Sequence, residues 1–126
     1  MTNPITVTNA GTLDLRYAVT STTTENTLSA QLALTIKSGV TTCTNAGFAG
    51  SGVVVYGPGV LGSMAGVNVI GNPAAGFQTG DRTLIAAANE ILCFSVSLPL
   101  ASGNAFQGLT TTATFAFQGE QTKNNP

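Results

Sequence analysis

Apolar side chains recur at every second position in several stretches of this chain, and this alternation limits the possible folds more than any other feature. Successive side chains of a β-strand point to opposite faces of a sheet, so a period of two places one face on a core and the other in solvent. The alternation is clear in residues 13–19, 28–37, 92–98 and 113–117. These segments predict strands.

The first two segments show the pattern most clearly. In the first, the polar face carries Asp14 and Arg16, which we expect to form an opposed charge pair. The second is the longest, and a helix could also place some of its apolar side chains along one stripe. Ala30 and Leu34 fit a period of two better, so we expect a strand there as well.

Weaker signals complete the pattern. Residues 5–8 predict a short strand, and residues 53–56 predict a strand that enters a turn at 57–59. A further strand is indicated at 67–70, and residues 105–107 fit one helical turn.

About seven strands joined by turns predict an all-β fold, specifically an antiparallel β-sandwich of jelly-roll type. Residues 57–80 would form a long glycine-rich connection within it. A chain of this length is expected to fold as one domain covering residues 1–126.

The charged residues are too few for several classes of function. The chain has no histidine, four basic and five acidic residues, and a formal net charge of −1. Proton transfer and metal ligation rely mainly on side chains that are scarce or missing here, so we expect no enzyme activity, no cofactor and no metal site. Without a basic cluster we also expect no nucleic-acid partner. Residues 52–71 are apolar, but their glycines and Pro58 argue against a membrane span.

Two motifs resemble catalytic or cofactor sites and are rejected. Gly57, Gly59 and Gly62 have the spacing of a dinucleotide-binding loop, but the β-branched residues that follow make a poor helix for holding a pyrophosphate. Asp81 and Glu90 could be imagined as a carboxylate pair for acid/base chemistry. Near predicted turns, such acids are more simply explained as solvated.

The two cysteines, Cys43 and Cys93, cannot make a structural zinc site without further ligands, so a disulfide between them is the expected pairing. Two separate buried thiols are the alternative. A disulfide persists in an oxidising compartment, which predicts a secreted protein. The first residues lack the basic start and apolar run of a signal peptide, so we expect Met1 to be an imposed or trimmed start.

Several short motifs resemble one known family. Residues 89–99 (NEILCFSVSLP), 103–108 (GNAFQG) and 114–121 (TFAFQGEQ) resemble the closing part of the TasA/camelysin family, in particular its actinobacterial members. Residues 7–13 (VTNAGTL), followed by 15–17 (LRY), resemble that family's internal strand pair.

This resemblance implies a jelly-roll protein that is exported by a dedicated signal peptidase. It also implies assembly into extracellular fibres of the biofilm matrix, in which each subunit lends a donor strand to its neighbour and other matrix components are possible partners. The donor strand and the first strands would then lie upstream of Ile5 and be missing here.

Two other functions are weighed against self-assembly. The first is a secreted adhesin or carbohydrate-binding module that uses the threonine-rich segments 22–24 and 110–112. The second is a metalloendopeptidase, a label that some relatives in the family carry. The missing histidine rules out a His-Glu-x-x-His zinc motif, so this last function is disfavoured.

Overall fold

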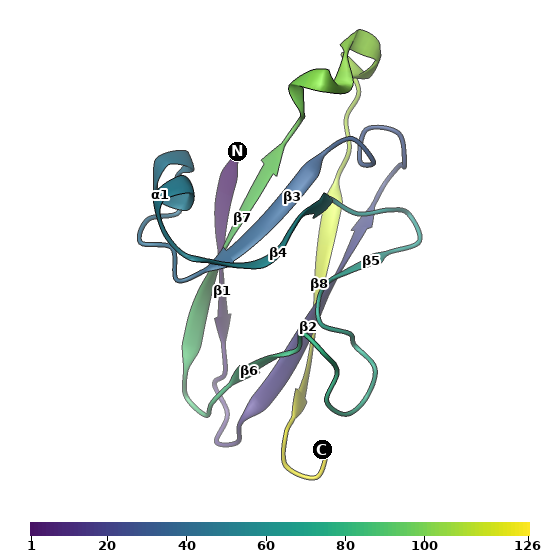
Figure 1. The fold of residues 1–126 in the computed structure, drawn as a ribbon. Helices are drawn as coiled ribbons and strands as arrows, with labels where there is room; N and C mark the ends of the chain where they lie inside the picture. The colour runs from purple at the N-terminus through teal and green to yellow at the C-terminus, as the bar shows by residue number, and fades with distance from the viewer.

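The alternating segments form strands in the computed structural model, which describes residues 1–126 (Figure 1). The strands are β1 (Thr2–Thr8), β2 (Leu15–Thr23), β3 (Ala33–Ser38), β4 (Val53–Val60), β5 (Val67–Ile70), β6 (Arg82–Leu84), β7 (Asn89–Ser97) and β8 (Ala113–Gln121). They pair antiparallel, which confirms the all-β prediction. The jelly-roll topology stays a prediction.

The strands make two four-stranded sheets. Sheet A has the order β1-β7-β3-β4. In sheet B the central strand β2 pairs along its whole length with β8, and on its other side with β5 and β6. The sheets face each other across one hydrophobic core, because each contributes the apolar face of its alternating strands. The buried core residues are Tyr17, Val19, Leu34, Ile36, Leu61, Val69, Ile70, Leu92 and Phe94.

The strand predicted at residues 28–37 is wrong in its first half, since β3 begins only at Ala33. The carboxylate of Glu25 accepts hydrogen bonds from the backbone N–H groups of Leu28 (2.7 Å) and Ser29 (3.0 Å). The Ser29 hydroxyl donates in turn to the Glu25 carbonyl at 2.6 Å. These local bonds satisfy the backbone in a turn, and so compete with sheet formation.

The turn predicted at 57–59 is also wrong, because β4 continues through it to Val60. The pairing of β4 with β3 shifts register between Leu34 and Ile36 and again between Ile36 and Lys37. Gly57 has a φ of +85°, and a Cβ built there would lie 2.2 Å from the Leu34 carbonyl oxygen. Glycine therefore permits a close approach of two backbones.

Three short helical elements join the strands, and one of them was predicted. The helix α1 (Asn45–Gly50) begins where the Thr44 side chain accepts a hydrogen bond from the Gly47 N–H at 3.1 Å. The 3-10 turns η1 (Leu100–Ser102) and η2 (Asn104–Phe106) lie between β7 and β8 and project from one end of the sandwich (Figure 1). The second turn agrees with the predicted helical turn to within one residue.

Candidate functional site

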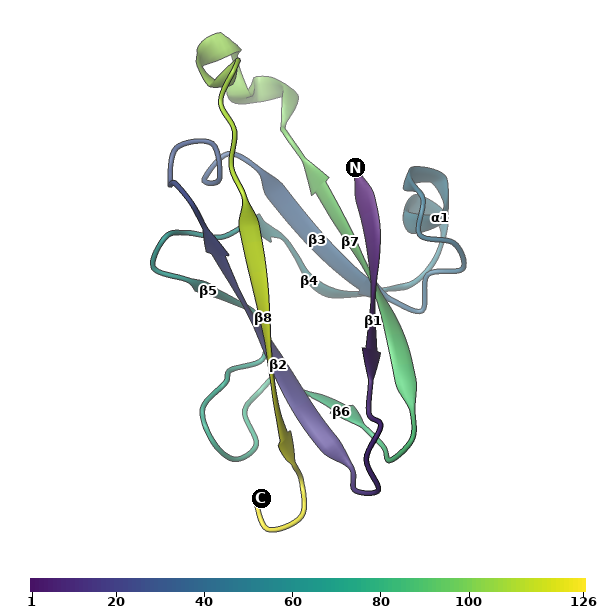
Figure 2. The same ribbon diagram turned by 180° about the vertical axis from the view of Figure 1, so that it is seen from behind.

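An apolar groove opens between β1, an edge of sheet A, and β8, an edge of sheet B. Figure 2 shows both strands on the near side of the molecule, with β3 and β7 behind them. The groove has a volume of about 370 Å³ and is lined mainly by apolar side chains, including Ile5, Phe94, Val96 and Phe115. No charged side chain lines the groove. Its one charged group is the amino terminus of the chain, at Met1.

The alternation of the strands places these side chains in the groove. Phe94 and Val96 lie on the inner face of β7, Ile5 on the inner face of β1, and Phe115 on the inner face of β8. The Phe94 and Phe115 rings meet edge to face with their centroids 4.8 Å apart, which joins the two sheets across the floor of the groove. Phe115 is only half-buried, because no strand lies beyond β8.

The outer edge of β8 carries unpaired backbone groups. At the two ends of its ladder with β2, the Thr24 N–H donates to the Thr112 carbonyl (3.1 Å), and the Thr122 N–H donates to the Asp14 carbonyl (3.0 Å). In an antiparallel pair, alternate residues bond to the partner while those between them face away. The residues of β8 that face outward are Ala113, Phe115, Phe117, Gly119 and Gln121. The Gln121 carbonyl accepts a hydrogen bond from the Asn125 side chain at 2.9 Å, so the open part of the edge is residues 113–119.

The outer edge of β1 is interrupted. Its ladder with β7 is bounded by bonds from the Val96 N–H to the Met1 carbonyl (2.9 Å) and from the Asn9 N–H to the Ala88 carbonyl (2.8 Å). The same alternation therefore turns the backbone of residue 4 outward. That residue is Pro4, which has no N–H, so the row of donors along this edge has a gap.

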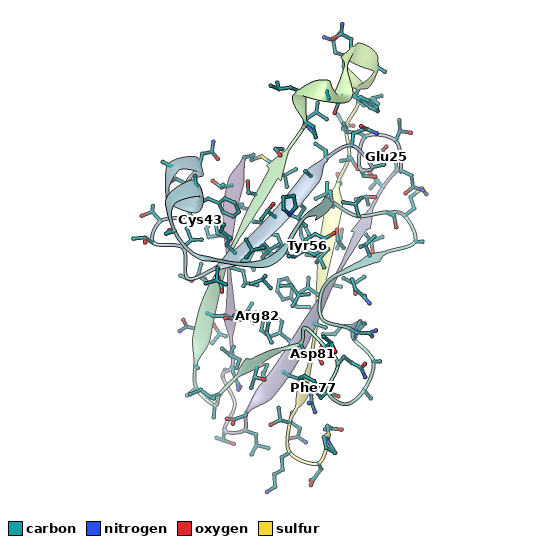
Figure 3. All side chains as sticks on the ribbon, viewed as in Figure 1. Glu25, Cys43, Tyr56, Phe77, Asp81 and Arg82 are labelled. Carbon is teal, nitrogen blue, oxygen red and sulfur yellow. A yellow bond between two sulfur atoms is a disulfide. The ribbon has the colours of Figure 1, made fainter.

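A disulfide joins Cys43 to Cys93, as predicted. It lies on the outer face of sheet A and ties the segment before α1 to β7 (Figure 3). Lys37 strengthens this attachment: its Nζ donates to the Phe48 carbonyl at 2.6 Å and lies 4.6 Å from the centre of the Phe48 ring.

A cluster of three polar side chains connects the two sheets at the end of the core beside β6. Arg82 on β6 donates from Nε and Nη2 to the two carboxylate oxygens of Glu90 on β7, each at 2.8 Å, and Tyr17 on β2 donates its hydroxyl to the same carboxylate. The hydrogen bond from Arg82 lowers the pKa of Glu90, against burial, which raises it. Burial and the adjacent Glu90 raise the pKa of Tyr17.

The charge pair predicted between Asp14 and Arg16 is wrong. Arg16 instead forms an ion pair with Glu120 on β8 at 2.7 Å, since β2 and β8 place these residues directly opposite each other. Asp14 accepts a hydrogen bond from the Ala86 N–H at 2.9 Å. Arg16 also borders a smaller cavity of about 170 Å³ with several polar residues in its walls, beneath the loop that holds Phe77 and Asp81 (Figure 3).

The other residues considered from sequence serve the fold. Asp81 accepts hydrogen bonds from the backbone N–H groups of Asn72 (3.0 Å) and Gln78 (2.8 Å), so its carboxylate has different partners from that of Glu90. In the glycine motif that was rejected as a dinucleotide-binding loop, Gly57 and Gly59 belong to β4, and the next element is the strand β5.

Sequence reasoning found the inner-face residues of β7 and β8, but it missed the groove between β1 and β8. Strand alternation looks the same whether a strand is central or at an edge, so only the order of strands in the sheets reveals the site.

No family model, no curated protein and no solved structure matches the chain. No helix has the length and apolar character needed to cross a membrane. The resemblance to the TasA/camelysin family stays a prediction, and the function must be argued from the groove and the two edges that border it.

Proposed function

We propose that this chain is a structural, non-enzymatic protein that self-assembles outside the cell into surface or biofilm-matrix fibres. Assembly proceeds by strand addition: an extended donor segment of one copy pairs with an open sheet edge of another. This proposal keeps the jelly-roll architecture and the partners expected from the family resemblance, namely other copies of the chain and other matrix components.

The observation that carries the proposal is the apolar groove between two sheet edges. A donor strand beside β8 would hydrogen-bond to its outward backbone groups and direct every second side chain onto Phe94 and Phe115. Burying apolar side chains stabilises the contact by roughly 25 cal/mol per Å² of apolar area removed from water. The groove therefore supplies both a backbone template and an apolar surface for the same segment.

Two further features support assembly outside the cell. The disulfide between Cys43 and Cys93 is of a kind that persists in oxidising compartments such as the cell exterior. The formal net charge of −1 gives only weak repulsion between copies of the chain. The disulfide suits a location outside the cell, and the low net charge suits close packing between copies.

The test is to compare the oxidised wild-type chain with two lysine variants by negative-stain electron microscopy and sedimentation. Ile5→Lys places a charge in the groove, whereas Thr6→Lys places the same charge on the outer face of the same strand. We expect fibres from the wild type and from Thr6→Lys, and no fibres from Ile5→Lys. The circular dichroism spectrum of Ile5→Lys should match that of the wild type, which shows that the variant is folded.

A wild-type chain that stays monomeric at about 1 mM, well above the dissociation constants of specific self-association, would overturn the proposal. If that monomer bound members of a glycan array, the adhesin or carbohydrate-binding function would take its place.

A further inference from the structure

The four sheet edges differ in how well they can accept another strand. The edge strand β4 contains Pro58 and two register shifts, while β5 and β6 have only four and three residues. In β1, Pro4 interrupts the outward donors. Proline, bulges and shortness are the devices by which proteins protect sheet edges from unwanted pairing.

The remaining edge, β8, has none of these devices. It is nine residues long and pairs with β2 without a register shift. Its segment 113–119 (ATFAFQG) contains no proline and no charged residue. An unprotected, uncharged and regular edge is a template for pairing with another chain.

We infer that β8 of one copy pairs antiparallel with β8 of a second copy about a two-fold axis. This inference rests on the proposed self-assembly, and it identifies the accepting edge and the donor segment as the same strand. The two-fold contact makes a closed dimer, which is the unit from which a fibre is built through a further contact.

The sequence of β8 complements itself in one register centred on Ala116. In that register Phe115 lies opposite Phe117 of the second copy, and Ala113 lies opposite Gly119. All four are outward-facing residues, so each of their N–H groups meets a carbonyl of the other copy. Aromatic residues opposite each other also stabilise paired strands.

The charges of the strand do not oppose this contact. Glu120 lies beyond the paired segment 113–119, and Arg16 of its own chain neutralises it through the ion pair at 2.7 Å. Ala116 is exposed on the outer face of sheet B and would lie directly opposite itself in the second copy. A substitution there acts on the contact without entering the core.

The test introduces charge at Ala116 and measures the oligomeric state by analytical ultracentrifugation over a range of concentrations. We expect the wild type to dimerise and Ala116→Lys to dimerise at least about tenfold more weakly, because like charges then face each other across the axis. Thr6→Lys on the β1 edge carries the same added charge and should dimerise like the wild type. An equimolar mixture of Ala116→Lys and Ala116→Glu should recover dimerisation as the heterodimer.

Any one of three results would overturn the β8 contact. These are an Ala116→Lys variant that dimerises as strongly as the wild type, a wild type that stays monomeric, and a loss of dimers in Thr6→Lys but not in Ala116→Lys. Electron microscopy of the same samples separates this inference from the fibre proposal. Dimers without fibres would contradict the fibre function and keep the β8 contact, whereas fibres from Ala116→Lys would keep the function and exclude β8.

Discussion

Glu90 joins the two sheets by side-chain hydrogen bonds at one end of the core. Its carboxylate accepts from Arg82 and Tyr17 of sheet B while its own backbone belongs to sheet A. The ionised form is favoured by these donors, as the lowered pKa of Glu90 indicates. Removing that charge leaves Arg82 without its partner, which costs more than the bond contributes.

We expect Glu90→Gln to lower the free energy of unfolding by about 2 kcal/mol at pH 7, as measured by denaturant titration. A carboxylate whose pKa is lowered by folding stabilises the protein above its unfolded pKa of about 4.3, and this stabilisation is lost as the pH falls through the lower folded pKa. The gap between wild type and Glu90→Gln should therefore be constant near neutral pH and shrink below about pH 4.

The exposed Lys123→Gln is the control, since Lys123 takes part in no ion pair or side-chain hydrogen bond. A gap between wild type and Glu90→Gln that persists undiminished at pH 2.5, or a loss in Lys123→Gln as large as in Glu90→Gln, would contradict this explanation of the cluster.

At the scale of elements, the two edges of the groove differ by one proline. The backbone of β8 offers a continuous row of outward donors over residues 113–119, whereas that of β1 is interrupted at Pro4. A proline in an edge strand removes one hydrogen bond from any added strand, and β1 should be the poorer acceptor for this reason.

Pro4→Thr restores the missing donor and should open β1 as a second pairing edge. We expect species larger than the wild-type dimer in size-exclusion chromatography with light scattering at equal concentration. Pro4 is exposed, so the core should be unaffected and the unfolding midpoint close to that of the wild type. An identical size distribution for Pro4→Thr and wild type would mean that Pro4 does not protect this edge.

The disulfide acts on the element that covers the outer face of sheet A. It closes a long loop between Cys43 and Cys93, 50 residues apart in the sequence. In the chain-entropy account, such a link stabilises the fold by up to about 4 kcal/mol. We expect the double variant Cys43→Ser/Cys93→Ser to lose about 2 to 4 kcal/mol of unfolding free energy in denaturant titration.

Reduction of the wild type should reproduce this loss, while the same reductant should leave the serine variant unchanged. Equal stability of oxidised and reduced wild type would show that α1 and β7 stay associated without the link.

At the scale of the whole molecule, the scarcity of charge bears on how copies meet. With a formal net charge of −1 and an uncharged β8 segment, long-range electrostatics contribute little to association. We therefore expect the dimer dissociation constant to change by less than about threefold between roughly 0.05 and 0.5 M NaCl in sedimentation equilibrium. A tenfold or larger change in the dissociation constant would mean that charged side chains, rather than the uncharged β8 segment, hold the dimer together.

Several features of this protein follow from its sequence alone because they are local or have few alternatives. The period of two in β2, β7 and β8 depends only on which side chains alternate, so the all-β class is predictable without coordinates. The disulfide was likewise predictable, because the chain has only two cysteines and lacks the further ligands of a structural zinc site.

Other features were decided only in the folded structure, since they depend on side-chain hydrogen bonds or on contacts between residues far apart in the chain. The hydrogen bonds of Glu25 hold residues 28 and 29 in a turn, so the strand predicted at 28–37 begins only at Ala33, which alternation does not reveal. Arg16 meets Glu120 rather than Asp14 because β8 lies beside β2. Which strands lie at an edge, and hence where the groove opens, is set by the order of strands in the two sheets. That order results from long-range packing, and the local period of each strand carries no information about it.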